Sequence, residues 1–145
     1  MNKFTKRIEA MNKMYKLSVN ETPTLPAQPA SRMIKFMTTL QEEVNEINDI
    51  VEHAVDGTPK EELITEIADL LGDVVVYCFS EAAKHGIPME DVLNIIMDSN
   101  ESKLGADGKP IINENGKFMK GPNYWKPESK IKALLESKGV TQGSW

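Results

Sequence analysis

Apolar residues recur every three or four positions along much of this chain, which is the spacing of one face of a helix. The first such run covers residues 4–17. A second begins after Ser31, an expected N-cap, and continues to about His53. Between them lie three prolines at intervals of three, in residues 23–29, which predict an extended connector. The connector is interpreted as a simple linker, with a loop over a pocket as the alternative.

The third apolar run has the strongest start signal in the sequence. Thr58 is followed three residues later by Glu61, which is the form of a capping box, and Pro59 suits the first helical position. The run ends before Gly86, a typical helix stop. A helix from Pro59 to His85 would be about 39 Å long at 1.5 Å per residue. We therefore expect it to be the central helix of the fold.

The remaining elements are shorter. A fourth helix is predicted from Pro88 to Leu104. Residues 109–112 and 117–119 flank the turn sequence NENG and predict a β-hairpin. A last helix is predicted over residues 127–138, and the residues after it are expected to be frayed.

Composition and charge narrow the class of protein. The chain has 145 residues, 40% of them hydrophobic and 27% charged, which fits one soluble globular domain. A net charge of −5 without a basic stripe argues against duplex nucleic acid as a partner. The N-terminus has no apolar signal-peptide core, and no charge-free stretch is long enough to span a membrane. We therefore expect a cytoplasmic protein, with its single cysteine, Cys78, buried.

Three carboxylates interrupt the third apolar run. Glu66, Asp69 and Asp73 follow one another at offsets of three and four. Charged side chains are rarely buried unless they are paired, and no Lys or Arg lies between residues 63 and 79. A purely structural role for Glu66 and Asp69 is therefore hard to sustain. Asp73 is interpreted as an outer-shell acceptor or a structural residue.

The second apolar run carries another acidic group, Glu42, Glu43 and Glu46, spaced by about one helical turn. Taken alone, these three could form a solvated helix face. The 19 residues between Glu46 and Glu66 allow an antiparallel return, so both helices can direct carboxylates at one place. Carboxylates about 4 Å apart repel by roughly 1 kcal/mol in water and roughly 4 kcal/mol at an effective dielectric of about 20. A hard divalent cation, Mg²⁺ or Mn²⁺, is the natural compensation.

These motifs resemble a known signature. The segments EEVNE (residues 42–46) and EIAD (residues 66–69) are similar to those of the all-α NTP pyrophosphohydrolases, a superfamily that includes MazG, the dimeric dUTPases and phosphoribosyl-ATP pyrophosphohydrolase. The later segments SNESK (residues 99–103) and DGKP…GK…KGPNY (residues 107–124) resemble a MazG-like subgroup found in bacteria and phages. The resemblance covers about residues 31–127.

The resemblance implies an all-α bundle of about four to five helices with a C-terminal β-hairpin, assembled as a homodimer or homotetramer. The whole chain would form one domain, with an N-terminal helix and connector (1–30), catalytic helices (31–104), and a hairpin and last helix (105–145). It implies a Mg²⁺-dependent hydrolase that cleaves a nucleoside triphosphate to the monophosphate and pyrophosphate. The implied metal ligands are Glu42, Glu43, Glu46, Glu66 and Asp69. Glu43 is the expected activator of the attacking water, with Glu42 as the alternative.

The resemblance also implies that Asn100 and Lys103 bind substrate, although a helix cap and a solvated lysine would explain them as well. Tyr124 and Trp125 are interpreted as packing residues rather than base-stacking residues. A dUTP-like deoxynucleotide is the first substrate expected. Phosphoribosyl-ATP or another pyrophosphate-linked nucleotide is the enzymatic alternative. A helical binding or assembly protein without catalytic activity is the alternative from another class.

Overall fold

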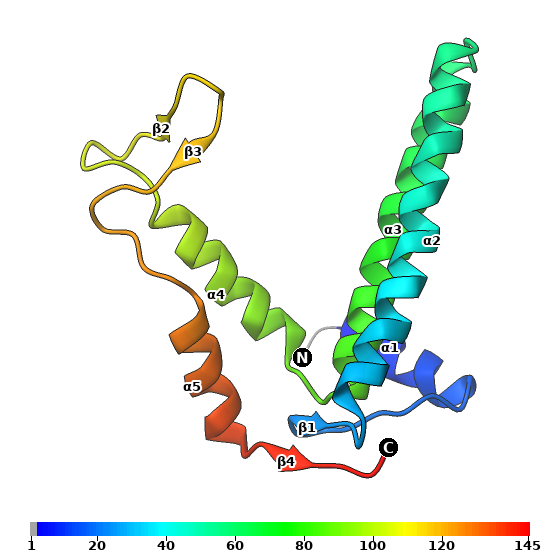
Figure 1. The fold of residues 1–145 in the computed structure, drawn as a ribbon, viewed down its shortest axis with the longest axis vertical. Helices are drawn as coiled ribbons and strands as arrows, with labels where there is room; N and C mark the ends of the chain where they lie inside the picture. The colour runs from blue at the N-terminus through cyan, green and yellow to red at the C-terminus, as the bar shows by residue number, and fades with distance from the viewer. Residues whose placement is uncertain (1–2) are drawn as a thin grey trace.

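The computed structural model describes residues 3–145, and these residues form a mainly helical fold (Figure 1). The helices are α1 (Lys3–Met14), α2 (Pro29–Val55), α3 (Lys60–Lys84), α4 (Met89–Glu101) and α5 (Glu128–Lys138). The strands, each of two residues, are β1 (Thr24–Leu25), β2 (Ile111–Ile112), β3 (Phe118–Met119) and β4 (Thr141–Gln142). The all-α fold class with a C-terminal hairpin is therefore confirmed.

Helices α2 and α3 form a long antiparallel hairpin, but neither begins as the sequence predicted. Helix α2 begins at Pro29, two residues before Ser31, because proline already holds the backbone angle that the first turn requires. Pro59 is itself the N-cap of α3, in an extended conformation, and no side chain caps the helix. Thr58 is therefore one residue too early for the predicted capping box, which the structure does not contain.

Helix α3 ends as predicted, and the connector packs against that end. Gly86 has a φ of 65°, and a Cβ at this position would lie 2.0 Å from the carbonyl oxygen of Thr22. The backbone N–H groups of Asn20 and Thr24 donate to the carbonyl oxygens of Ala83 and His85, at 3.0 and 2.8 Å. The proline-rich connector is thus attached to the base of α3 rather than a free linker.

The C-terminal residues are ordered, contrary to the expectation of fraying. Strand β4 pairs in parallel with β1, with Thr24 opposite Thr141. The Trp145 ring packs edge-on against the His85 ring, with centroids 4.9 Å apart. The strand pairing joins residues 117 positions apart and the ring contact joins residues 60 positions apart, so local patterns gave no indication of either.

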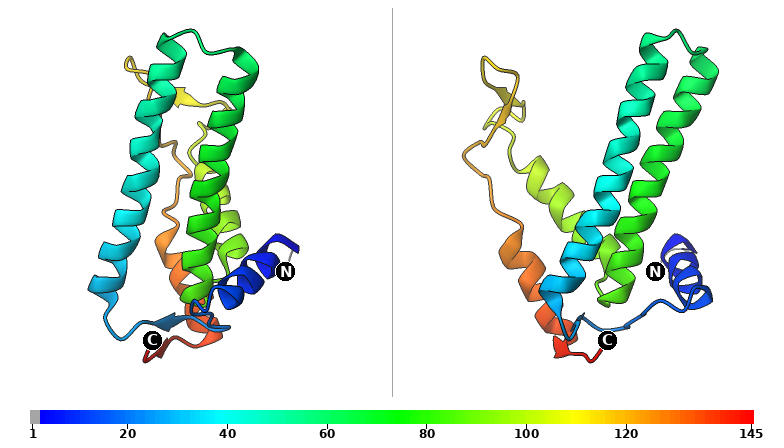
Figure 2. Two further views of the ribbon diagram at one scale, coloured as in Figure 1. Left: turned by 90° about the vertical axis from the view of Figure 1, so that its right-hand side faces the viewer. Right: turned by 45° about the vertical axis from the view of Figure 1, so that its right-hand side comes forward.

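Two arms diverge from this base, as Figures 1 and 2 show. One arm is the α2–α3 hairpin, with α1 packed on α3. The other contains α4, the predicted β2–β3 hairpin, and α5 packed on α4. Among the described residues, no comparable packing joins α4 to the α2–α3 hairpin.

The open shape leaves a small core. The apolar residues that are buried in the described part of the chain are Ile8, Ala82, Ala83 and Val92. Large apolar side chains are exposed along both arms, among them Met33, Met37, Val44, Ile47, Leu71, Val75 and Met97. None of the helices in residues 3–145 has the length and apolar character needed to cross a membrane.

Candidate metal centre

A cluster of three carboxylates lies between α2 and α3. Glu43 and Glu46 come from one turn of α2, and Asp73 comes from the middle of α3. One carboxylate oxygen of each residue lies within 4.8 Å of those of the other two. The antiparallel pairing of the two helices brings these side chains together although 30 positions separate Glu43 from Asp73.

Glu43 is the central member of the cluster. It is 8% exposed, and its Oε2 atom is buried without a hydrogen-bond partner. Burial raises the pKa of the Glu43 carboxyl above its usual range, and the neighbouring Glu46 and Asp73 carboxylates raise it further. A buried acceptor beside two like charges is electrostatically unfavourable unless a cation or a proton neutralises it.

Tyr77 lies beside this cluster, one turn after Asp73 on α3, and was not predicted as a site residue from the sequence. A hydrogen bond from its hydroxyl acts against the other effects and lowers the pKa of Glu43. Burial raises the pKa of Tyr77 itself, and the negative charges of Glu43, Asp73 and Glu42 add to this rise. The hydroxyl therefore stays protonated and serves as a donor to the carboxylate group. Its spacing of four residues from Asp73 was the available signal.

The other predicted metal ligands lie outside the three-carboxylate cluster. Glu42 and Asp69 are exposed at its edges. Glu66 is seven residues from Asp73 on the same helix, about 10.5 Å along the axis, so the two cannot share one ion. One oxygen of Glu66, Oε1, instead lies 2.6 Å from Nδ1 of His53, across the hairpin. Asp73, expected to be outer-shell or structural, takes the position facing Glu43.

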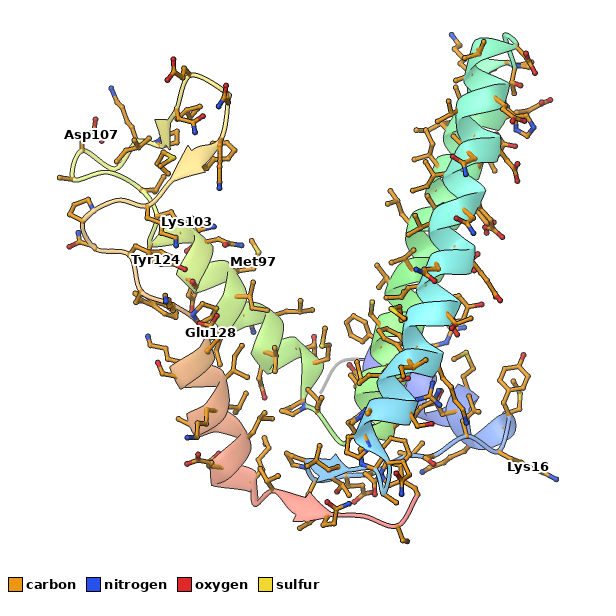
Figure 3. All side chains as sticks on the ribbon, in the orientation of Figure 1. Lys16, Met97, Lys103, Asp107, Tyr124 and Glu128 are labelled. Atoms are coloured by element: carbon orange, nitrogen blue, oxygen red, sulfur yellow. The ribbon has the colours of Figure 1, made fainter. Side chains whose placement is uncertain are left out.

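Asn100 and Lys103 lie on the other arm, at the end of α4, where Figure 3 labels Lys103. Both line a cavity of about 480 Å³ between α4 and the β2–β3 hairpin. The two serines of the same SNESK segment have a structural role. The Ser99 hydroxyl donates to the carbonyl oxygen of Trp125 (2.9 Å). The Ser102 hydroxyl accepts a hydrogen bond from the backbone N–H of Trp125 (3.2 Å).

The donor set of the cluster fits a hard divalent cation. All three side chains offer carboxylate oxygens, the ligand type that Mg²⁺ and Mn²⁺ prefer. The spacing of at most 4.8 Å is close to the separation of two ligands on opposite sides of one ion with bonds of about 2.1 Å. The unpartnered Glu43 oxygen is independent support, since an ion would satisfy it.

Comparisons with known proteins identify the family of the chain. Residues 32–103, about half of the chain and including both acidic groups, match the MazG nucleotide pyrophosphohydrolase domain. The fold is similar to the crystal structure of a candidate NTP pyrophosphohydrolase from Exiguobacterium sp. 255-15, with a TM-score of 0.53 and 20% sequence identity over 94% of this chain and 95% of that one. No curated protein matches the chain. The chain belongs to the all-α NTP pyrophosphohydrolase superfamily and is a hydrolase that acts on nucleotide anhydrides.

Proposed function

We propose that the protein is a Mg²⁺-dependent pyrophosphohydrolase that converts a deoxynucleoside triphosphate to the monophosphate and pyrophosphate, with dUTP as the first substrate to test. The observation that carries the proposal is the buried, unpartnered Oε2 of Glu43 within a group of three carboxylates. A divalent cation would neutralise this group and in turn attract the negatively charged triphosphate.

Glu43, Glu46 and Asp73 would hold the cation. Bound there, a Mg²⁺ ion supplies charge neutralisation at the phosphates and a lower pKa for a coordinated water. Glu42 is exposed next to Glu43, and its carboxylate is free to accept a proton from the attacking water. The bond from the water oxygen to the α-phosphorus forms, the α–β anhydride bond breaks, and pyrophosphate leaves. Asp69, one turn from Asp73, remains a candidate ligand for a second ion.

The open shape of the chain supports a homodimer as the working form. The accessible surface is 10245 Å². A compact monomer of 16.2 kDa is expected to expose about 7,500 Å². The excess of roughly 2,700 Å² per chain is on the scale of an obligate homodimer interface. Met97, which is exposed, points to the side of α4 that faces the α2–α3 arm, where a second copy would cover it (Figure 3).

A second copy would also complete the site. Within one chain the acidic cluster is on the α2–α3 arm, whereas Asn100 and Lys103 are on the α4 arm, and in residues 3–145 no packing comparable to that of α2 on α3 joins the two. If the α2–α3 hairpin of the partner enters the space between the arms, the Lys103 ammonium can approach phosphates bound at the partner's carboxylates. We therefore propose that each site uses the carboxylates of one chain and the α4 end of the other.

The test is pyrophosphate release from a panel of NTPs, dNTPs and phosphoribosyl-ATP, with Mg²⁺, Mn²⁺ or EDTA. Wild type is compared with Glu43→Gln and with Glu52→Gln, a matched change at an exposed position of the same helix. We expect metal-dependent release that is lost in Glu43→Gln and kept in Glu52→Gln. A folded wild-type protein that releases pyrophosphate from none of these substrates would contradict the proposal.

A further inference from the structure

The cavity at the end of α4 has a divided lining. Its polar residues, Asn100, Glu101 and Lys103, come from the last turn of α4 and the residues just after it. Its remaining lining is apolar and comes from Leu104 and the β2–β3 hairpin, namely Pro110, Ile111, Phe118 and Met119. A volume of about 480 Å³ is in the size range of small-molecule sites. The lining holds one ammonium group, that of Lys103, and one carboxylate, that of Glu101, beside an apolar wall. This matches a ligand with a phosphate end near Lys103 and a flat, weakly polar end.

The β2–β3 hairpin is fixed against the end of α4, so the apolar wall of the cavity is already formed without a ligand. The backbone N–H of Gly121 donates to the carbonyl oxygen of Lys103 at 2.7 Å. A Cβ on Gly121 would lie 2.0 Å from the carbonyl oxygen of Leu104, so only glycine permits this approach. Together with the Ser99 and Ser102 bonds to Trp125, these contacts hold the returning chain against the end of α4.

Strand pairing divides the hairpin side chains between two faces, and residues of both faces line the cavity. Ile111 pairs with Met119, and Ile112 pairs with Phe118, so the two pairs occupy opposite faces of the ribbon. Ile111 and Met119 both line the cavity, and each is 41% exposed. Of the other pair, Phe118 also lines the cavity, whereas Ile112 does not line it and is 53% exposed. Ile111 and Ile112 are therefore identical side chains, adjacent in sequence, on the two sides of one hairpin.

The nearby aromatic rings are already in contact with lysines of the same chain. The Lys130 ammonium lies 3.8 Å from the centroid of the Trp125 ring, and the Lys120 ammonium lies 5.0 Å from that of Tyr124. The expectation that these two residues pack rather than stack on a base stays a prediction. The apolar wall that remains open to a ligand is made by the apolar cavity residues, namely Leu104, Pro110, Ile111, Phe118 and Met119.

We propose that this cavity is the nucleobase pocket of the enzyme, with the base against Ile111 and Met119 and the phosphates directed past Lys103. The thioether of Met119 suits a flat aromatic partner. The assignment rests on the proposed function, because the triphosphate must extend from Lys103 to a carboxylate cluster. The assignment gives the β2–β3 hairpin a role in binding the base. The hairpin is not needed for metal binding, since α2 and α3 supply the carboxylates.

The experiment measures binding, so that it does not depend on turnover. Calorimetry in Mg²⁺ gives the Kd of α,β-imido-dUTP, which resists cleavage at the reacting bond, and of inorganic triphosphate, which has no base. Ile111→Ala is compared with wild type and with Ile112→Ala. We expect Ile111→Ala to weaken nucleotide binding about ten-fold, with inorganic triphosphate unchanged, because only the base loses its contact. Ile112→Ala should bind both ligands as wild type does.

Any one of three results would contradict the assignment of this cavity as the nucleobase pocket. The apolar wall would have another role if Ile111→Ala and Ile112→Ala changed the Kd of the nucleotide equally. The same conclusion would follow if Ile111→Ala weakened the binding of nucleotide and inorganic triphosphate equally, or if Ile111→Ala alone dissociated the oligomer. Pyrophosphate release by the wild type separates the two proposals. If wild type hydrolyses dNTPs and Ile111→Ala binds nucleotide normally, the proposed function stands and the base pocket is wrong.

Discussion

Glu43 of α2 and Asp73 of α3 face each other across the helical hairpin, and together with Glu46 they bring carboxylate oxygens within 4.8 Å. The arrangement places like charges next to a buried oxygen that has no hydrogen-bond partner. Such a site is destabilising for the metal-free protein and favourable for a cation. Stability and metal affinity are therefore expected to oppose each other at these residues.

The first prediction concerns Asp73. Asp73→Asn should raise the melting temperature of the metal-free protein, because one of three like charges is removed. The same change should weaken Mn²⁺ binding at least about ten-fold, because a carboxylate ligand is lost. Thermal melts in EDTA and calorimetric Mn²⁺ titrations measure the two effects. Asp49→Asn, at an exposed position of α2, is the control and should change neither. A lower melting temperature for Asp73→Asn in EDTA would count against a repulsive cluster.

A second prediction follows from the raised pKa of Glu43. The native state holds a proton that the unfolded chain releases, so the free energy of unfolding should fall as pH rises past the ordinary glutamate value of about 4.3. Glu43→Gln should remove this loss. It should be more stable than wild type at neutral pH in EDTA and equal to it below pH of about 4. Urea unfolding of both proteins across this range provides the measurement, and a constant difference at all pH values would contradict it.

Tyr77 gives a third prediction. Its hydrogen bond lowers the pKa of Glu43, so Tyr77→Phe should raise that pKa further. Metal binding competes with the proton on Glu43, so the substitution should weaken Mn²⁺ binding more at acidic than at alkaline pH. Mn²⁺ titrations at several pH values test this. A loss of affinity that does not vary with pH would assign Tyr77 a packing role only.

The sequence predicted those parts of the fold that local signals determine. Gly86 ends α3, and the turn after Asn113 forms the β2–β3 hairpin, as expected from their residue types. The pairing of β1 with β4 was not predictable, because it depends on residues 117 positions apart. The same limit applies to the site. Spacing shows which residues share a face of one helix, but it does not give the axial offset between two helices.

That offset decides which carboxylates meet. The sequence identified Glu43 and Glu46 as part of an acidic group, and the structure brings these two together. Opposite them stands Asp73 rather than Glu66, which lies two turns further along and contacts His53. The metal-ligand roles of Glu42, Glu66 and Asp69 stay predictions.

A fourth prediction concerns the buried Ser99, which is 2% exposed. Ser99→Ala should lower the free energy of unfolding by about 1–3 kcal/mol, since the carbonyl group of Trp125 loses its donor. Ser129→Ala, at an exposed position of α5, is the control and should change it by less than about 0.5 kcal/mol. Urea denaturation measures both. Equal stability of the two variants would show that the Ser99 bond contributes nothing to the attachment of the returning chain.

The proposed shared site gives a fifth prediction. Asp73→Asn and Lys103→Ala should each be inactive alone. After the two variants are unfolded, mixed and refolded, half of the dimers contain one chain of each, and half of their sites are intact. About a quarter of wild-type activity should therefore return. An inactive mixture, with heterodimers confirmed by mass spectrometry, would mean that each site belongs to one chain.

The most direct test of the metal centre is anomalous diffraction from crystals grown with Mn²⁺ and α,β-imido-dUTP. We expect an anomalous peak bound by Glu43, Glu46 and Asp73, with the α-phosphate next to it. A peak held by Glu66 and Asp69 without Asp73, or no peak between α2 and α3 in crystals that contain the nucleotide, would contradict it.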